Sequence, residues 1–171
     1  MQEHLITTKE VSYLSRDMSS HVDEEKINTY IRESEDIDIK SALGSTLFVD
    51  MKEHPEKYEL LLNGGTYTDG CGEIHSFSGL KRALAYYTYA RLVKNADGNL
   101  TRFGFVEKGN EYSNNAEFKK QLMAYNDAFS IADAYLKECV MFLNENKKDY
   151  PLYKGNGGIK AKRTSYRIIG D

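Results

Sequence analysis

The stretch GLKRALAYYTYARLVK, residues 79–94, decides the fold. It contains no proline and no internal glycine, and its apolar residues recur on nearly every side of a helical projection. A helix that is apolar almost all round is typical of a buried position. The sequence therefore predicts a central helix over residues 79–94, in which Leu84, Tyr87 and Ala90 are buried.

A second long helix is predicted over residues 115–147, which is roughly 45–50 Å at 1.5 Å per residue. Its apolar residues recur at alternating spacings of four and three, which is the pattern of one apolar stripe. The stripe consists of Phe118, Leu122, Tyr125, Phe129, Ala132, Leu136, Cys139 and Leu143. We expect Phe129 or Leu136 to pack against the central helix. Such a helix is either a core spine or a strut that reaches a neighbouring protein.

Shorter helices are predicted in the N-terminal part. Thr7 or Thr8 caps a helix over residues 9–16, and Asp23 caps the next one. The inward face of that second helix shifts after Asp36, which predicts a bend near residues 36–38 and a further helix ending at residue 54. Its expected inward residues are Ile39, Ala42, Leu43, Thr46, Leu47 and Met51. Pro55 then starts a short helix over residues 56–62.

Turn-forming residues mark two non-helical segments. The pair Asp69-Gly70 between Tyr67 and Ile74 predicts a small hairpin-like insertion at about residues 64–77. Residues 95–114 are predicted to be a loop with one short strand. The predicted fold class is therefore all-α, a mainly helical bundle with a small β-hairpin or loop insertion and an extended C-terminal tail.

Composition narrows the class of protein. The chain has 171 residues, 40% of them hydrophobic and 29% charged, and a net charge of −3, which argues against a dedicated nucleic-acid binder. No apolar run approaches the ~20 residues of a membrane span, and the first residues do not predict a secretory signal. Cys71 and Cys139 lie in a turn and a helix, so we expect no disulfide and synthesis in a reducing cytoplasm.

The C-terminal end has a different character. We predict a helical body over residues 1–153 and a flexible hinge and docking tail over residues 154–171, with Gly155, Gly157 and Gly158 in the hinge. Basic and apolar residues alternate in the tail, which favours docking onto a partner, including strand addition to a sheet edge. The candidate partner-binding residues are Ile159, Lys160, Lys162, Arg163, Tyr166, Arg167, Ile168 and Ile169.

The sequence contains no complete set of metal ligands, catalytic residues or phosphate-binding residues. Cys71 and His75 have a spacing that suits two zinc ligands, but four ligands are normally required and no second pair exists. No motif assigns a carboxylate that would orient them as a thiol catalyst. The glycines before Lys160 lack the Gly-Lys-Ser/Thr ending of a phosphate loop. We therefore expect no catalytic residue, cofactor or bound metal.

An acidic stretch covers residues 23–38. Spread over helical turns, such a stretch is most often a solvated face, and the sharper alternative is a docking face for basic groups of a partner. Asp36 and Asp38 are close enough in sequence to act as an acid and a base, but nothing in the sequence provides them with a pocket.

Several short segments, in this order and spacing, resemble one known family. They are Leu5-Ile6-Thr7-Thr8, Ala42-Leu43-Gly44, Tyr58-Glu59-Leu60-Leu61-Leu62-Asn63-Gly64, Ser78-Gly79-Leu80-Lys81-Arg82-Ala83-Leu84-Ala85-Tyr86-Tyr87, Leu100-Thr101 with Gly104, and Asp149-Tyr150-Pro151. The family is the head–tail connector, or adaptor, proteins of tailed bacteriophages, as found in phages and prophages of Bacteroides-type bacteria, including crAss-like phages. The resemblance covers about residues 5 to 152 and carries over no individual contact residue.

The resemblance implies a structural virion protein. Such adaptors form a ring, usually of twelve copies, beneath the portal, and join the packaged capsid to the tail. The implied partners are neighbouring copies, the portal protein and tail proteins, with no membrane and no sequence-specific nucleic acid, although packaged DNA passes through the ring. The implied location is the head–tail junction of the virion, after synthesis in the host bacterial cytoplasm.

Two alternatives come from other classes of protein. One is a small DNA-associated or regulatory phage protein that uses the basic tail as a phosphate-binding arm, against which the acidic body argues. The other is an enzyme of an unrecognised type centred on Cys71 and His75.

Overall fold

The computed structural model describes residues 3–18, 22–95, 98–101, 104–107 and 114–155. The described chain is mainly helical with small antiparallel hairpins, which confirms the predicted fold class. Residues 156–171 of the predicted tail, which include its eight candidate partner-binding residues, lie outside the described residues. Among the described helices, none has both the length and the apolar character needed to cross a membrane.

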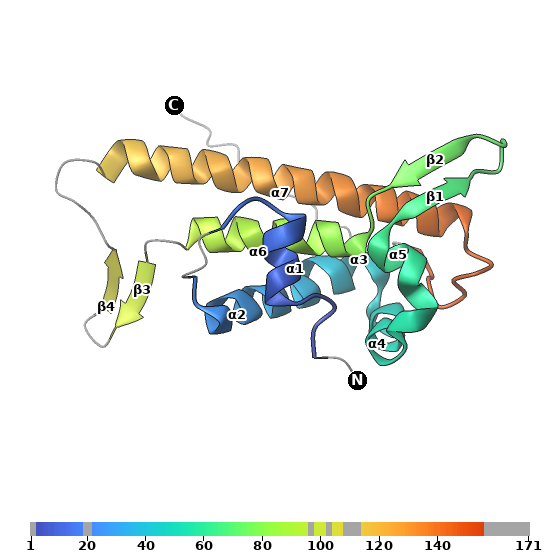
Figure 1. Cartoon of the computed structure of the whole chain (residues 1–171), viewed down its shortest axis with the longest axis horizontal. Coiled ribbons are helices and arrows are strands. Elements are labelled where there is room, and N and C mark those ends of the chain that lie inside the picture. Colours follow the sequence, from blue (N-terminus) through green and yellow to red (C-terminus); the bar gives the residue numbers. More distant parts are fainter. Residues whose placement is uncertain (1–2, 19–21, 96–97, 102–103, 108–113, 156–171) are drawn as a thin grey trace, which may run out of the picture.

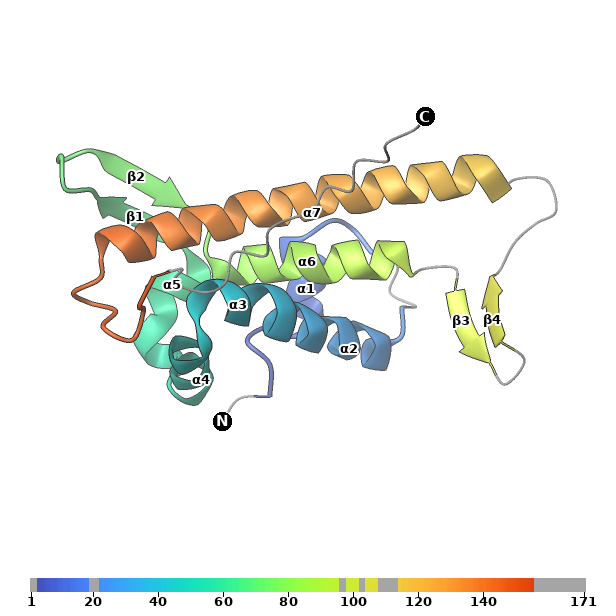
Figure 2. The same cartoon turned by 180° about the vertical axis from the view of Figure 1, so that it is seen from behind.

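Two helices form the centre of the molecule. Helix α6 (Leu80–Lys94) and the long helix α7 (Asn114–Glu145) run side by side in opposite directions. Both views show α6 in the middle layer, with α7 on one side and the N-terminal helices on the other (Figures 1 and 2). Leu84, Tyr87 and Ala90 of α6 are buried as predicted, and the ring of Tyr87 meets that of Phe129 edge-on at 5.1 Å.

The apolar stripe predicted for α7 is correct in part. Ala132, Cys139 and Leu143 are buried, together with Ala128 and Phe142, which the spacing pattern did not select. Leu122 is 44% exposed, so its predicted place in the core is wrong. The physical reason is that Leu122 lies level with the end of the covering helix, since the neighbouring Gln121 donates to the carbonyl oxygens of Val93 and Lys94 in the last turn of α6.

The N-terminal layer begins with two capped helices. In α1 (Thr8–Leu14), Thr7 and Glu10 form a reciprocal capping box, and in α2 (Glu24–Ser34) the Asp23 carboxylate accepts from the N–H of Glu25. The predicted bend is a π-helical turn, η1 (Glu35–Ile39). This turn holds one residue more than an α-helical turn, which explains the shift of the inward face after α2.

The helix expected up to residue 54 is interrupted. Gly44, with a φ of 85°, separates α3 (Lys40–Leu43) from α4 (Ser45–Glu53), and Thr46 is exposed rather than inward as predicted. Glycine adopts this left-handed conformation without steric cost, which explains why the chain turns here. A short 3-10 turn, η2 (Pro55–Tyr58), and α5 (Glu59–Asn63) follow.

The predicted hairpin insertion is present. Strand β1 (Gly65–Thr68) pairs with β2 (Ile74–Phe77), and the pair projects from one end of the molecule beside the end of α7 (Figure 1). At the other end, β3 (Gly98–Thr101) and β4 (Gly104–Glu107) pair as a second hairpin. The expectation of one short strand in that segment is therefore corrected to two.

Two glycines bring the base of the first hairpin against the start of α6. Gly64 ends α5 with a φ of 83°, and Gly79 precedes α6 with a φ of 85°. A Cβ on Gly79 would lie 2.4 Å from the nitrogen of Gly64, and a Cβ on Gly64 would lie 2.5 Å from the carbonyl oxygen of Phe77. No side chain fits at either position, so this backbone contact depends on glycine.

Candidate functional site

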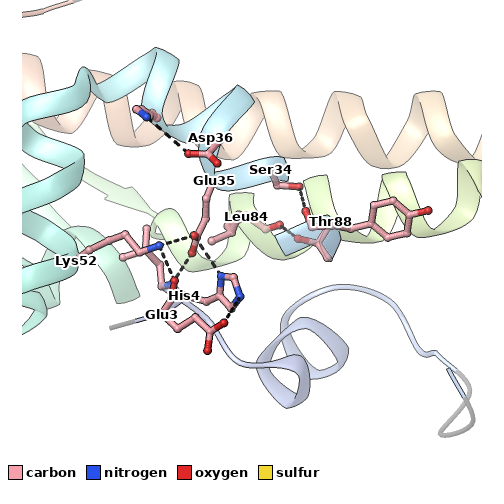
Figure 3. A network of polar contacts seen from close by, with 11 residues as sticks. Glu3, His4, Ser34, Glu35, Asp36, Lys52, Leu84 and Thr88 are labelled. Atoms are coloured by element: carbon pink, nitrogen blue, oxygen red, sulfur yellow. Dashed lines mark hydrogen bonds and ion pairs between the residues drawn. The ribbon is translucent and has the colours of Figure 1, made fainter. Parts of the chain in front are cut away.

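A buried carboxylate lies at the start of the π-helical turn. Glu35 is 1% exposed and accepts hydrogen bonds from the backbone N–H of Leu5 at 2.5 Å and from Nζ of Lys52 at 2.9 Å (Figure 3). The Nδ1 atom of His4 lies 3.4 Å from the same carboxylate. Lys52 also donates to the carbonyl oxygen of Glu3 at 2.6 Å, so the cluster ties the N-terminal segment to α4.

The prediction that the acidic stretch is a solvated face is wrong for Glu35. The side chain points inward because Glu35 follows the buried Ile31 by four residues, and the π turn keeps Ile39 on that same side. A buried charge is costly unless it is paired, and here an ammonium and a backbone N–H supply the pairing. The arrangement fixes the N-terminal segment in place, which is a structural role.

Asp36 and Asp38, the two acidic residues that lie close together in the sequence, have separate partners in the structure. Asp38 forms an ion pair with Arg91 of α6, with Oδ2 and Nη1 2.8 Å apart, and burial raises the pKa of its carboxyl group. Asp36 faces Lys40 at 3.7 Å instead. The structure therefore does not bring Asp36 and Asp38 together as an acid and a base.

A cavity of about 310 Å³ lies between α1, α5 and the start of α6. One of its walls is formed by Lys81 and Arg82, and Lys81 pairs with Glu10 at 2.7 Å. Tyr13, at its rim, is 86% exposed. The cavity combines the exposed ring of Tyr13 with the guanidinium of Arg82, and tyrosine and arginine are both enriched in contacts between proteins.

The cysteines occupy different environments. Cys71 is exposed in the turn between β1 and β2, and Cys139 is buried in α7, where burial raises the pKa of its thiol to about 12. Cys71 and His75, whose spacing would suit two zinc ligands, are not paired in the structure. Instead, Nε2 of His75 lies 3.0 Å from Oδ2 of Asp69.

The hairpin turn contains a group of ligand-type side chains that the sequence analysis missed. One donor atom each of Asp69, Glu73 and His75 lies within 4.8 Å of the others. The signal in the sequence is the alternation Asp69, Cys71, Glu73, His75 across a predicted turn. Cysteine and histidine are the commonest ligands of structural zinc, so the spacing of Cys71 and His75 does not by itself indicate the two carboxylates.

The fold and these clusters define a layered helical protein with a projecting hairpin and polar groups fixed inside the body. The chain belongs to a family of unknown function (DUF6712), whose model matches residues 39–163. That range starts at the end of the π turn and includes α6, α7 and both hairpins. No curated protein and no solved structure matches the chain.

Proposed function

We propose that this chain is a structural subunit of the head–tail connector of a tailed bacteriophage, forming a ring beneath the portal and joining the packaged capsid to the tail. In this proposal it has no catalytic role, and its partners are neighbouring copies, the portal protein and tail proteins. Its location is the head–tail junction of the virion. The proposal rests on the resemblance of the segments quoted above and on the surface described next.

The observation that carries the proposal is the outer face of α7, which we define by Met123, Ala134 and Met141. Met123 and Met141 are 18 residues apart, about five turns at 3.6 residues per turn, so they lie on the same side of the helix. They are 64% and 49% exposed. Both views show the side of α7 away from α6 without another described element along most of its length (Figures 1 and 2). Methionine is among the residue types that are enriched in protein–protein interfaces.

Charge separation supports the same proposal. Residues 156–171 contain four basic residues and one acid, a net charge of +3, which leaves −6 for residues 1–155 within the total of −3. A head-to-tail ring needs two different complementary surfaces on each copy. The exposed acids Glu24, Glu25, Glu33 and Asp36 of α2 and η1 offer an acidic surface for a basic segment of a neighbour.

The first test is the mass of the assembly. We expect light scattering to show a ring-sized oligomer when the purified chain is mixed with its portal protein. Met123→Glu should abolish this assembly while leaving the thermal midpoint unchanged. Thr46→Glu adds the same charge at an exposed position of α4, away from both proposed surfaces, and serves as the matched control. A chain that stays monomeric under all conditions, with and without portal, overturns the proposal.

The second test concerns the tail. A chain truncated after Tyr153 should keep a folded body, because Tyr153 is the last buried residue that the structure describes. We expect this shortened chain to lose binding to the portal or to the neighbouring subunit, since it lacks both the apolar anchors and the basic residues of the tail. Normal affinity of the shortened chain contradicts the assigned role of the tail.

The basic tail also favours a second candidate, a small DNA-associated or regulatory phage protein. Phosphate contacts of basic residues make binding steeply salt-dependent. If this second function holds, the isolated full chain binds duplex DNA in low salt, and the chain truncated after Tyr153 does not. Binding to portal without binding to DNA favours the connector.

A further inference from the structure

The turn of the first hairpin presents ligand-type side chains at every second position. Asp69, Cys71, Glu73 and His75 follow one another in the stretch DGCGEIH, residues 69–75. The structure gathers three of them, because one ligand atom each of Asp69, Glu73 and His75 lies within 4.8 Å of the other two. The thiol of Cys71 is not part of this group.

The group is held in place by the backbone and by the aromatic core. Oδ1 of Asp69 accepts from the N–H groups of Cys71 at 2.8 Å and Glu73 at 2.9 Å, which leaves Oδ2 to face the His75 ring. That ring stacks on Tyr67, with centroids 5.3 Å apart. Tyr67 in turn meets Phe142 of α7 edge-on at 5.3 Å. The histidine is therefore oriented by contacts that lead into the body.

The electrostatic surroundings favour a cation. Besides Asp69 and Glu73, the carboxylate of Glu145 at the end of α7 reaches the turn, since its Oε2 lies 3.4 Å from the nitrogen of Gly70. Among the described residues, no lysine or arginine forms an ion pair with any of these three carboxylates. An imidazole nitrogen beside them distinguishes the group from an ordinary acidic surface.

We propose that Asp69, Glu73 and His75 bind one Zn²⁺ ion. A mixed set of imidazole nitrogen and carboxylate oxygens suits zinc better than magnesium, which takes oxygen ligands almost alone. Ligand atoms around a tetrahedral zinc ion lie about 3.4 Å apart, given bonds of about 2.0–2.2 Å, so side-chain rotations suffice to close the group. Three protein ligands leave a fourth position for water or for a group of a neighbouring molecule.

Zinc binding replaces the contact between His75 and Asp69. The Nε2 atom of His75 donates to Asp69 in this contact and must carry no proton to coordinate the metal, so the imidazole takes the form protonated at Nδ1 and zinc competes with protons for Nε2. Oδ1 of Asp69 keeps its two backbone hydrogen bonds while Oδ2 turns to the metal. The ion fixes the tip of the hairpin without changing its strands.

The test is calorimetric titration of the full, untagged chain with Zn²⁺. We expect saturation at one ion per chain and no saturable binding of Mg²⁺. His75→Ala and Glu73→Gln should each weaken the zinc affinity at least about 10-fold. Glu73 is exposed, so Glu73→Gln keeps the fold even if a change at Asp69 disturbs the turn.

Two control variants make the test specific. His54 lies 3.2 Å from Asp50 in a pair that resembles His75 and Asp69 but has no third ligand among the described residues, so His54→Ala should leave the zinc affinity unchanged. Cys71→Ser should also leave it unchanged. Absence of saturable binding, or binding insensitive to both ligand variants, overturns the site, and loss of binding in Cys71→Ser overturns the assigned ligands. The isolated chain suffices for this titration, so its outcome is independent of ring assembly.

Discussion

Helices α6 and α7 lie side by side, yet they use their residues differently. In α6 the buried residues Leu84, Ala85 and Ala90 lie on different sides of the helix, whereas α7 buries one side and turns Met123 and Met141 outward. A helix covered on all sides contributes to folding alone. A helix covered on one side contributes to folding and keeps a surface for partners. The difference suggests that substitutions on α6 change stability, and substitutions on the outer face of α7 change assembly.

The largest expected effect is at the glycine that precedes α6. Gly79→Ala should lower the free energy of unfolding by at least about 3 kcal/mol, because its Cβ would overlap the backbone of Gly64 in addition to the strain of the left-handed conformation. Gly72→Ala is the matched control, since Gly72 has a similar φ of 89° and open space around it. Urea denaturation measures both. Equal losses in the two variants would mean that strain alone accounts for the effect.

The next largest difference is expected between alanine substitutions of two leucines, one on α6 and one on α7. Leu84→Ala should cost about 2–5 kcal/mol, because Leu84 is completely buried in α6. Leu122→Ala should cost less than about 1 kcal/mol, because that side chain is 44% exposed on α7. Thermal and urea unfolding of both variants give the comparison. If the two losses are similar, the assignment of α6 to the interior and of α7 to the surface is wrong.

A smaller loss of unfolding free energy is expected at the buried carboxylate of Glu35, which lies on the side of α6 opposite to α7. Lys52→Ala removes the ammonium that faces Glu35, and we expect a loss of about 2–3 kcal/mol, below the range for a completely buried pair because the Leu5 N–H remains. Lys57→Ala removes an exposed charge of the next turn and should be nearly neutral. Chemical denaturation of both variants at neutral pH checks the difference.

The smallest expected effect concerns the hairpin tip beside the end of α7. The hydrogen bond from His75, with those from the backbone, lowers the pKa of Asp69 in the folded chain. A carboxyl group whose pKa is lowered by folding stabilises the fold above its ordinary pKa near 3.9, and this contribution is lost as the pH falls through the lowered value. The difference in unfolding free energy between the natural chain and Asp69→Asn should therefore shrink as the pH falls below about 4. A difference that stays constant with pH contradicts this.

The sequence was sufficient for features that depend on local patterns. The caps at Thr7 and Asp23, the all-round apolar helix α6 and the turn at Asp69-Gly70 are each determined by neighbouring residues. The inward turn of Glu35 was missed, because a π turn and a distant lysine at residue 52 decide it together. Contacts between residues far apart in the chain leave no periodic signal.

At the candidate site, too, local sequence indicates the segment but not the contacts within it. The spacing of Cys71 and His75 drew attention to the correct turn, but the partner of His75 depends on side-chain directions in that turn. Likewise, Leu122 fits the stripe of α7 by spacing and is exposed because it lies level with the last turn of α6, where that helix ends. Periodicity identifies the face that a helix can bury, and the lengths of its neighbours decide how much of that face is buried.

The π turn between α2 and α3 has a consequence at the level of the gene. It accommodates one extra residue in an otherwise continuous helix, and Ile37 within it is 58% exposed. Loss of the Ile37 codon would restore an ordinary helical turn and keep Ile31 and Ile39 on the buried side. Loss of one codon inside α6, such as that of Ala85, would instead rotate every following residue of the helix by about 100°. Natural length variation in such chains is therefore expected at the π turn and not in the central helix.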